Sequence, residues 1–206
     1  MLTPNEIPRK EPKVRIGIIL PTDSIKTLRC SFSDPQCYEI ETSTKILPSC
    51  KNEKEFNIQI SDRNIVIPEL SLKDKNIKLI PSILDENPFV KINQVPVGRG
   101  FHWEKNIDLS YWGTIELSYF KNNIMVINEL PLENYLKCVA TSEMSAICPK
   151  EFLKAQYIVA RSWLLANIER KHVQLGFDIC NDDCCQRYQG ILNTTKTSNE
   201  IADLTF

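Results

Sequence analysis

The sequence predicts an α+β fold in which a β-hairpin-rich N-terminal scaffold precedes a two-helix segment. Short runs of alternating apolar and polar residues, separated by turn residues, occupy residues 14–129. Apolar residues at helical spacing then dominate residues 130–206. Most of the twelve prolines precede this change, as expected for short strands and turns. We therefore divide the chain into a polar lead-in (1–13), a β-rich part (14–129) and a helical part with a cysteine-containing loop (130–206).

The strands of the β-rich part follow from local pattern. The apolar run at residues 14–20 predicts a mostly buried strand, whereas residues 21–54 are mixed. Two pairs of runs around polar turns predict hairpins, and the clearer pair surrounds Lys121-Asn122-Asn123, where Asn tolerates positive φ. The predicted strands are residues 56–60 and 64–67 (first hairpin), 77–80, 89–92, and 113–120 and 124–127 (second hairpin).

The first predicted helix carries an acidic residue at its end. Leu132, Tyr135, Leu136 and Val139 lie at i, i+3, i+4 and i+7, which is one apolar face of a helix. Glu143 continues that face at the C-terminal end. Burial and the negative end of the helix dipole both raise a carboxyl pKa, which suits a general acid working near neutral pH. The other interpretation is a carboxylate paired with a nearby Lys or Arg.

The second predicted helix begins at Pro149 and extends about 33 Å, with Arg170, Lys171 and His172 in its last turn. One of its faces mixes amide and aromatic side chains, which suits a sugar site because amides bond hydroxyls and an indole stacks on a pyranose ring. The same composition is typical of a half-buried helix. This face comprises Gln156, Ala160, Trp163 and Asn167, and the adjoining face comprises Phe152, Ala155, Val159, Ser162 and Ala166.

Four potential zinc ligands follow within fourteen residues: His172, Cys180, Cys184 and Cys185. Thiolates and imidazole are the ligands that zinc prefers. The adjacent pair Cys184 and Cys185 would be strained if both bound one ion. A Cys180–Cys185 disulfide and free thiols are the alternatives, and the same choice applies to the whole set of eight cysteines.

The other cysteines lie in different local settings. Cys30 and Cys37 flank a polar turn at a separation that would allow a disulfide. Cys138 and Cys148 are expected to be small buried apolar groups rather than reactive thiols.

Composition excludes some classes of partner. A net charge of −1 gives no electrostatic argument for nucleic acid or an anionic membrane. No stretch approaches the roughly 20 apolar residues of a transmembrane helix. The apolar run at residues 16–20 is too short for a signal-peptide core, so the sequence predicts no signal peptide.

Four blocks in order resemble one family. Residues 130–136 (LPLENYL) precede Glu143-Met144, then LKAQ at 153–156 and Ala160-Arg161, then FDIC at 177–180 and CQRYQG at 185–190. This series resembles the stage II sporulation protein D family (SpoIID/LytB), whose members are peptidoglycan lytic transglycosylases or enhancers of cell-wall amidases. Two departures are Ser145, where the family usually has Pro, and an apparent truncation of the family domain after Phe206.

The resemblance implies a function and a site. A lytic transglycosylase needs one carboxylate, here Glu143, to cleave the MurNAc–GlcNAc backbone and leave 1,6-anhydro-MurNAc ends. Gln156, Arg161 and Tyr188 are the expected substrate-binding residues. Cys180 and Cys185, with His172 upstream, match a family zinc site that would be structural, since the chemistry requires no cofactor.

The resemblance also implies partners and alternatives. Glycan strands of peptidoglycan in the cell envelope are the expected partner, with a cell-wall amidase as a second. A non-catalytic wall-binding partner or amidase enhancer is the alternative function. A zinc-stapled structural module is the third interpretation, because it needs the cysteines but gives Glu143 no role.

Overall fold

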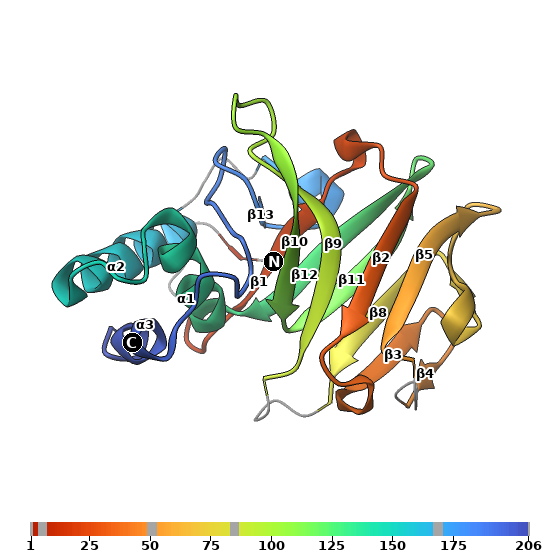
Figure 1. Cartoon of the computed structure of the whole chain (residues 1–206), viewed down its shortest axis with the longest axis horizontal. Coiled ribbons are helices and arrows are strands. Elements are labelled where there is room, and N and C mark those ends of the chain that lie inside the picture. The colour runs from red at the N-terminus through yellow and green to blue at the C-terminus, as the bar shows by residue number, and fades with distance from the viewer. Residues whose placement is uncertain (1, 4–7, 49–52, 83–86, 167–170, 206) are drawn as a thin grey trace. The chain divides into compact units, whose positions relative to one another are not determined.

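The computed structural model describes residues 2–3, 8–48, 53–82, 87–166 and 171–205. Within these residues, thirteen strands in two sheets and three α-helices confirm the α+β prediction (Figure 1). The chain forms two compact units: unit 1 comprises Met1–Ile16 and Leu130–Phe206, and unit 2 comprises Gly17–Glu129. Strands β1 (Lys13–Ile19) and β12 (Asn123–Pro131) carry the chain from one unit to the other.

Unit 2 is built from antiparallel strands. One sheet contains, in order, β12, β11 (Thr114–Phe120), β8 (Asn76–Pro81), β3 (Tyr38–Thr42) and β4 (Ile46–Leu47). The other contains β10 (Lys105–Trp112), β9 (Phe89–Val97), β2 (Thr27–Phe32), β5 (Glu55–Ser61), β6 (Asn64–Ile67) and β7 (Leu72–Asp74). Single 3₁₀ turns lie at Pro21–Asp23, Pro35–Cys37 and Pro68–Leu70.

Alternating apolar residues form the core of unit 2. Inward positions of neighbouring strands are fully buried, and Phe32 packs against Tyr38 and Phe56 with ring centroids 4.8 Å apart. The outward positions of β2 and β5 are polar, which is the pattern of a sheet with one solvated face. The buried positions include Leu28, Cys30, Phe56, Ile58, Ile65, Ile67, Ile77, Leu79, Ile115 and Leu117.

Both predicted hairpins are confirmed. Strand β5 pairs with β6, and β11 pairs with β12 from Thr114↔Glu129 to Phe120↔Asn123. Lys121 and Asn122 adopt φ of 46° and 67°, so the turn uses the left-handed conformation expected there. The mixed interval at residues 21–54 contains strands β2 and β3. Cys30 and Cys37 lie in this interval, are both buried, and are not joined by a disulfide.

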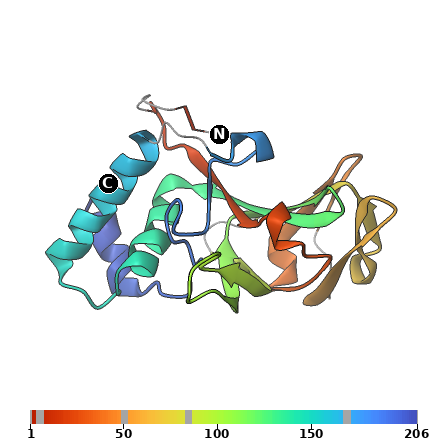
Figure 2. The same cartoon turned by 90° about the horizontal axis from the view of Figure 1, so that it is seen from above.

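Three helices pack together in unit 1: α1 (Leu132–Glu143), α2 (Lys150–Ala166) and α3 (Lys196–Asp203) (Figure 2). The described part of α2 ends at Ala166, and Asn167 and Arg170 lie outside the described residues. Lys171 and His172 form a turn rather than the predicted last turn of a helix, because His172 stacks on Phe177 at 5.1 Å.

The loop after α2 contains a 3₁₀ turn (Val173–Leu175) and strand β13 (Ile179–Cys180). Asp178 fixes this loop to the start of β1 within unit 1. Its carboxylate accepts from the backbone N–H of Arg15 at 2.9 Å, and its own N–H donates to the carbonyl of Arg15 at the same distance. Among the described helices, none has the length and apolar character needed to cross a bilayer.

Candidate active site and adjoining cysteine cluster

Glu143 is the last residue of α1, and two other segments of unit 1 hold its carboxylate. The amide Nε2 of Gln156, on α2, donates to Oε2 of Glu143 at 2.5 Å. The backbone N–H of Arg187, in the loop after β13, also bonds this carboxylate. The three sequence blocks that carry Glu143, Gln156 and Arg187 therefore converge on one half-buried carboxyl group.

The pKa of Glu143 is raised above its ordinary value, as the sequence predicts. Burial is the largest cause, because it disfavours the charged form, and the nearby Asp183 carboxylate acts in the same direction. The bonds from Arg187 and Gln156 and the charge of Arg187 oppose the rise. Arg187 is itself paired with Asp183, at 3.1 Å. The Glu143 carboxyl group thus has a raised pKa and accepts hydrogen bonds from two donors, the Gln156 side chain and the Arg187 backbone.

The break after Glu143 is stabilised although Ser145 replaces the usual family Pro. The carbonyl of Ser145 accepts from the backbone N–H of Cys148 at 3.0 Å, and its Oγ accepts from the N–H of Ile147 at 3.4 Å. Immediately before Glu143, Ser142 Oγ donates to the carbonyl of Cys138 at 2.7 Å and accepts from the N–H of Gln189 at 3.1 Å. Side chains and loop therefore hold the end of α1 in place without a proline.

Arg161 lies away from Glu143 in a separate ion pair. Its guanidinium donates to both carboxylate oxygens of Glu133, at 2.9 and 2.6 Å. The two side chains are only 19% and 16% exposed, so the pair links α1 to α2 in a largely dry setting. The two motif residues on α2 therefore differ in role. Gln156 contacts Glu143 directly. Arg161 links α2 to α1, the helix that carries Glu143.

Tyr188 is fully buried, which is inconsistent with the expected direct contact to substrate in this structure. Its ring packs on Tyr135 with centroids 5.2 Å apart. The hydroxyl of Tyr135 donates to Oε1 of Gln186 at 2.8 Å, and Nε2 of Gln186 lies 3.3 Å from the carbonyl of Ala160. These residues form a buried polar contact that fixes the loop against α1 and α2.

The exposed side of α2 is unusually apolar. Leu153, Tyr157, Ala160 and Leu164 form its buried face, and four large apolar side chains lie outside that face. Trp163 is 40% exposed and follows Gln156 by two turns, about 10.5 Å along the helix. The exposed large apolar residues are Phe152, Ile158, Val159 and Trp163.

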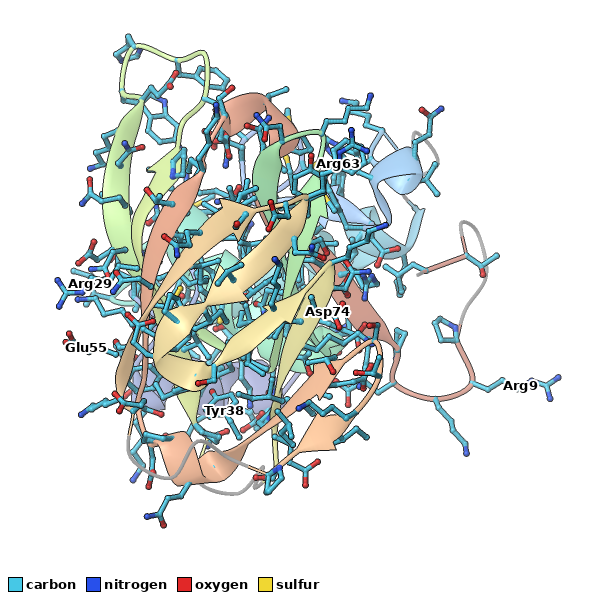
Figure 3. The ribbon with its side chains drawn as sticks, turned by 90° about the vertical axis from the view of Figure 1, so that its right-hand side faces the viewer. Arg9, Arg29, Tyr38, Glu55, Arg63 and Asp74 are labelled. Carbon is cyan, nitrogen blue, oxygen red and sulfur yellow. The ribbon has the colours of Figure 1, made fainter. Side chains whose placement is uncertain are left out.

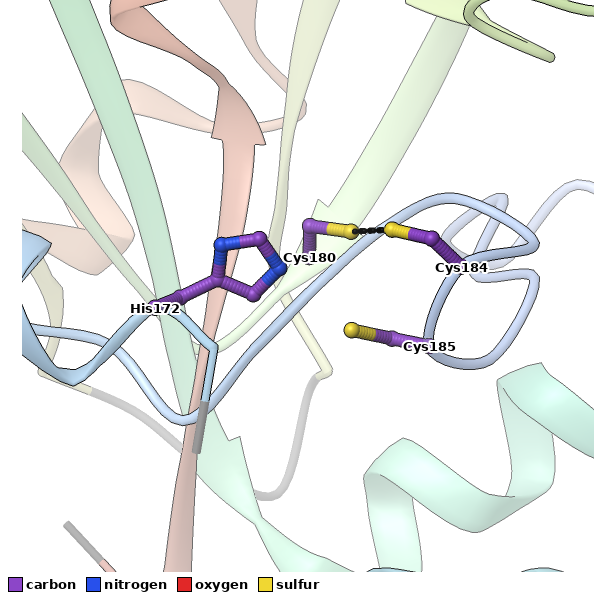
Figure 4. Close-up of side chains that lie close together, drawn as sticks. All are labelled: His172, Cys180, Cys184 and Cys185. Atoms are coloured by element: carbon purple, nitrogen blue, oxygen red, sulfur yellow. Dashed lines mark hydrogen bonds between the residues drawn. The ribbon is translucent and has the colours of Figure 1, made fainter. Parts of the chain in front are cut away.

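The three predicted metal-ligand residues, His172, Cys180 and Cys185, converge in unit 1, and Cys184 joins them. The ligand atoms of His172, Cys180, Cys184 and Cys185 all lie within 4.8 Å of one another (Figure 4). The Sγ atoms of Cys180 and Cys184 lie 3.2 Å apart. Cys184 belongs to this cluster despite its adjacency to Cys185, because the loop turns between Asp182 and Cys185, whose backbone groups bond at 2.9 Å.

The donor set fits zinc. Three thiols and one imidazole match the ligands of structural zinc sites. Nε2 of His172 is buried and has no hydrogen-bond partner among the described residues, which is costly for a polar atom. The hydrogen bond with Cys180 lowers the pKa of Cys185, which favours a thiolate at that position.

Comparison with known protein families gives a match that lies mostly in unit 1. Residues 120–205 match the family model for the stage II sporulation protein SpoIID. The match covers less than half of the chain, so it describes what these residues are similar to. The matched residues contain α1, α2, α3 and the cysteine cluster. The family match confirms the resemblance seen in the sequence. The family match supports a role related to sporulation or the cell wall.

A curated relative extends the comparison. The chain is 34% identical over 107 residues to an uncharacterized protein of Brachyspira hyodysenteriae. The match covers 49% of this chain and 29% of the relative, so the chain spans under a third of that protein. No solved structure matches the chain.

Two contacts of the site were not anticipated from the sequence. Asp183 and Arg187 lie in the cysteine-containing loop and modify the electrostatics of Glu143. Their only sequence signal is their position, Arg187 within the Cys185–Gly190 block and Asp183 two residues before it, since their approach to Glu143 depends on the path of the loop.

Proposed function

We propose that this chain is a peptidoglycan lytic transglycosylase in which Glu143 is the single acid and base. The observation that carries the proposal is a half-buried carboxyl group with a raised pKa, held by Gln156 and the backbone of Arg187 within the residues that match the SpoIID family model. A raised pKa keeps a carboxyl group protonated closer to neutral pH, as proton donation to a leaving group requires.

The proposed reaction balances with one carboxyl group. Protonated Glu143 donates its proton to the glycosidic oxygen that follows N-acetylmuramic acid, and the bond from C1 to that oxygen breaks. The resulting carboxylate then accepts the proton of the C6 hydroxyl while O6 forms a bond to C1. The products are a free sugar hydroxyl and a 1,6-anhydro end, and no water is consumed. An ordinary glycosidase would use a second carboxylate to activate water or to attack C1.

Neighbouring residues have separate roles in this proposal. The Gln156 amide orients the Glu143 carboxyl group, and Trp163 offers an exposed indole face for the apolar side of a pyranose ring. Arg161 acts as a positioning residue through Glu133. We assign Tyr188 to packing, because its burial leaves no surface for a sugar.

We also propose that the cysteine cluster holds a structural zinc ion. His172, Cys180, Cys184 and Cys185 would be its four ligands. Zinc there would staple the loop that delivers the Arg187 N–H to Glu143. The cluster would therefore support the acid without taking part in proton transfer.

The experiment is mass spectrometry of peptide-free glycan strands after incubation with the parent chain and with Glu143→Gln. Glu151→Gln is a matched control, because Glu151 is an exposed glutamate on α2, paired with Lys154. Anhydro ends from the parent and from Glu151→Gln, but not from Glu143→Gln, are the expected result. Equal product from Glu143→Gln would exclude the assigned acid.

An amidase-enhancing role is the second candidate, and one observation favours it. The exposed apolar side chains of Phe152, Ile158 and Val159 on α2 are typical of a surface that binds another protein. This candidate predicts stimulation of a cell-wall amidase that survives Glu143→Gln but is reduced by Val159→Asp. Such a result without anhydro products would favour the enhancer.

A further inference from the structure

One side of α2 brings three exposed apolar side chains into line with the residue that holds Glu143. An α-helix turns by about 100° per residue, so positions 152, 156, 159 and 163 fall within an arc of about 60°. These positions are Phe152, Gln156, Val159 and Trp163, and we call them the α2 strip. The buried residues of α2 are centred about 100° further round the helix. The α2 strip therefore lies beside the buried face and outside it.

The α2 strip is exposed except where it meets the candidate acid. Phe152 is 49% exposed, Val159 is 61% exposed and Trp163 is 40% exposed. Gln156 is half-buried, and its amide donates to Oε2 of Glu143 at 2.5 Å. Because the four side chains leave the helix on one side, Glu143 and the apolar side chains border the same stretch of surface.

The α2 strip carries no charge of its own. The charged residues in the described part of α2 all lie outside it, and they are Lys150, Glu151, Lys154 and Arg161. Three of them form ion pairs, Lys154 with Glu151 and Arg161 with Glu133. The solvated face of a helix commonly carries charged side chains, so an apolar strip without them is an exception.

The ordinary solvated surface of this chain is different. In unit 2, Arg29 on β2 and Glu55 on the neighbouring strand β5 form an exposed ion pair, and Figure 3 shows their side chains reaching out from the same side of the unit. Asp62 and Lys73 form a second exposed pair. Grouped apolar side chains that remain exposed, as in the α2 strip, are typical of a binding surface.

The two aromatic residues of the α2 strip lie on opposite sides of Gln156. At about 1.5 Å per residue, Phe152 is about 6 Å from Gln156 toward the start of α2, and Trp163 is about 10.5 Å from it toward the end. The two aromatic residues are thus about 16.5 Å apart along the helix axis. A ligand that contacts both of them must be an extended chain, longer than one sugar ring.

We propose that the α2 strip binds an extended glycan strand on both sides of the bond next to Glu143, with one pyranose ring stacked on Phe152 and another on Trp163. This inference rests on the proposed function, which uses Trp163 alone, and it adds Phe152 and Val159 as substrate-binding residues. The C–H faces of pyranose rings pack on the aromatic rings, and Val159 provides apolar surface between Gln156 and Trp163. Rings held on both sides of the scissile bond place cleavage inside a strand, so the first products are internal fragments.

The test is calorimetric titration of the full chain, carrying Glu143→Gln to prevent cleavage, with peptide-free glycan strands of defined length. Affinity should rise from a disaccharide to an octasaccharide, because only the longer ligand reaches both aromatic rings. Phe152→Ala and Trp163→Ala should each weaken octasaccharide binding by about 3- to 10-fold, since each removes one ring contact. Phe101→Ala is the matched control, because Phe101 is 47% exposed in the β9–β10 loop of unit 2, and it should leave binding unchanged.

The outcomes separate the α2 strip from the assigned acid. Unchanged octasaccharide affinity in Phe152→Ala and Trp163→Ala, or an equal loss in Phe101→Ala, would overturn the α2 strip as a glycan site. Stimulation of a cell-wall amidase that falls in Phe152→Ala, with glycan affinity unchanged, would assign the strip to a protein partner instead. Release of disaccharides from one strand end by the parent chain, with the rest of the strand left long, would overturn binding on both sides of the bond. If the parent chain yields no anhydro ends while both aromatic variants lose affinity, the catalytic proposal fails and the glycan site stands.

Discussion

The ion pair between Arg161 and Glu133 permits a quantitative test of how unit 1 is held together. Arg161→Met would leave the Glu133 carboxylate, 16% exposed, without its bidentate partner. Removing one member of a fully buried pair costs roughly 3–5 kcal/mol. Because both side chains keep some contact with solvent, we expect a loss of about 2–3 kcal/mol in the free energy of unfolding. For a chain of this size that corresponds to a fall of roughly 4–12 °C in Tm.

The assay is urea unfolding followed by circular dichroism at 222 nm, since the three described α-helices all lie in unit 1. The double variant Glu133→Gln with Arg161→Met should lose less stability than the sum of the single variants, by at least about 1 kcal/mol. Lys154→Met, in the exposed pair with Glu151, should change stability by less than about 1 kcal/mol. Additive effects for Glu133 and Arg161 would refute the view that their contact aligns α1 and α2.

Three further predictions concern the site. Gln156→Ala removes a hydrogen bond that lowers the pKa of Glu143, so the pKa of Glu143 should rise. Because activity needs the protonated acid, activity should persist to higher pH in pH–rate measurements. An unchanged or lower pH at which activity falls on the alkaline side would contradict this. Trp163→Ala should raise KM for glycan strands more than it lowers kcat, and a pure loss of kcat would argue against a stacking role. The purified chain should contain zinc when it is measured by elemental mass spectrometry. The Cys180→Ser variant should lose the zinc, and the Cys148→Ser variant should retain it. A parent chain without zinc would exclude the proposed site.

Local patterns were sufficient to predict α1, α2 and both hairpins, whereas α3 was not predicted. The periodicity from Leu132 to Val139 predicted α1, and the turn at Lys121-Asn122-Asn123 predicted the β11–β12 hairpin. Strand β2 was missed although Leu28, Cys30 and Phe32 alternate with polar residues. The sequence allowed a Cys30–Cys37 disulfide, whereas in the structure the free Cys30 thiol is a buried apolar group of this strand.

The site could be predicted only where a residue's role depends on its own helix. The position of Glu143 at the end of an apolar helix face predicted its burial and its raised pKa. The inclusion of Cys184 and the approach of Arg187 depend on the path of the loop after β13, which has no periodicity to reveal it. Burial of Tyr188 depends on the same loop, so its motif position suggested a substrate contact that the structure does not provide.

The most direct test of the account is the release of 1,6-anhydro-MurNAc ends from peptide-free glycan strands, measured by mass spectrometry for the parent chain and for Glu143→Gln. Circular dichroism and Tm of both proteins would establish that the variant is folded. The account predicts anhydro ends from the parent and none from the folded variant. Equal amounts of product from both proteins would contradict the assignment of Glu143 as the acid.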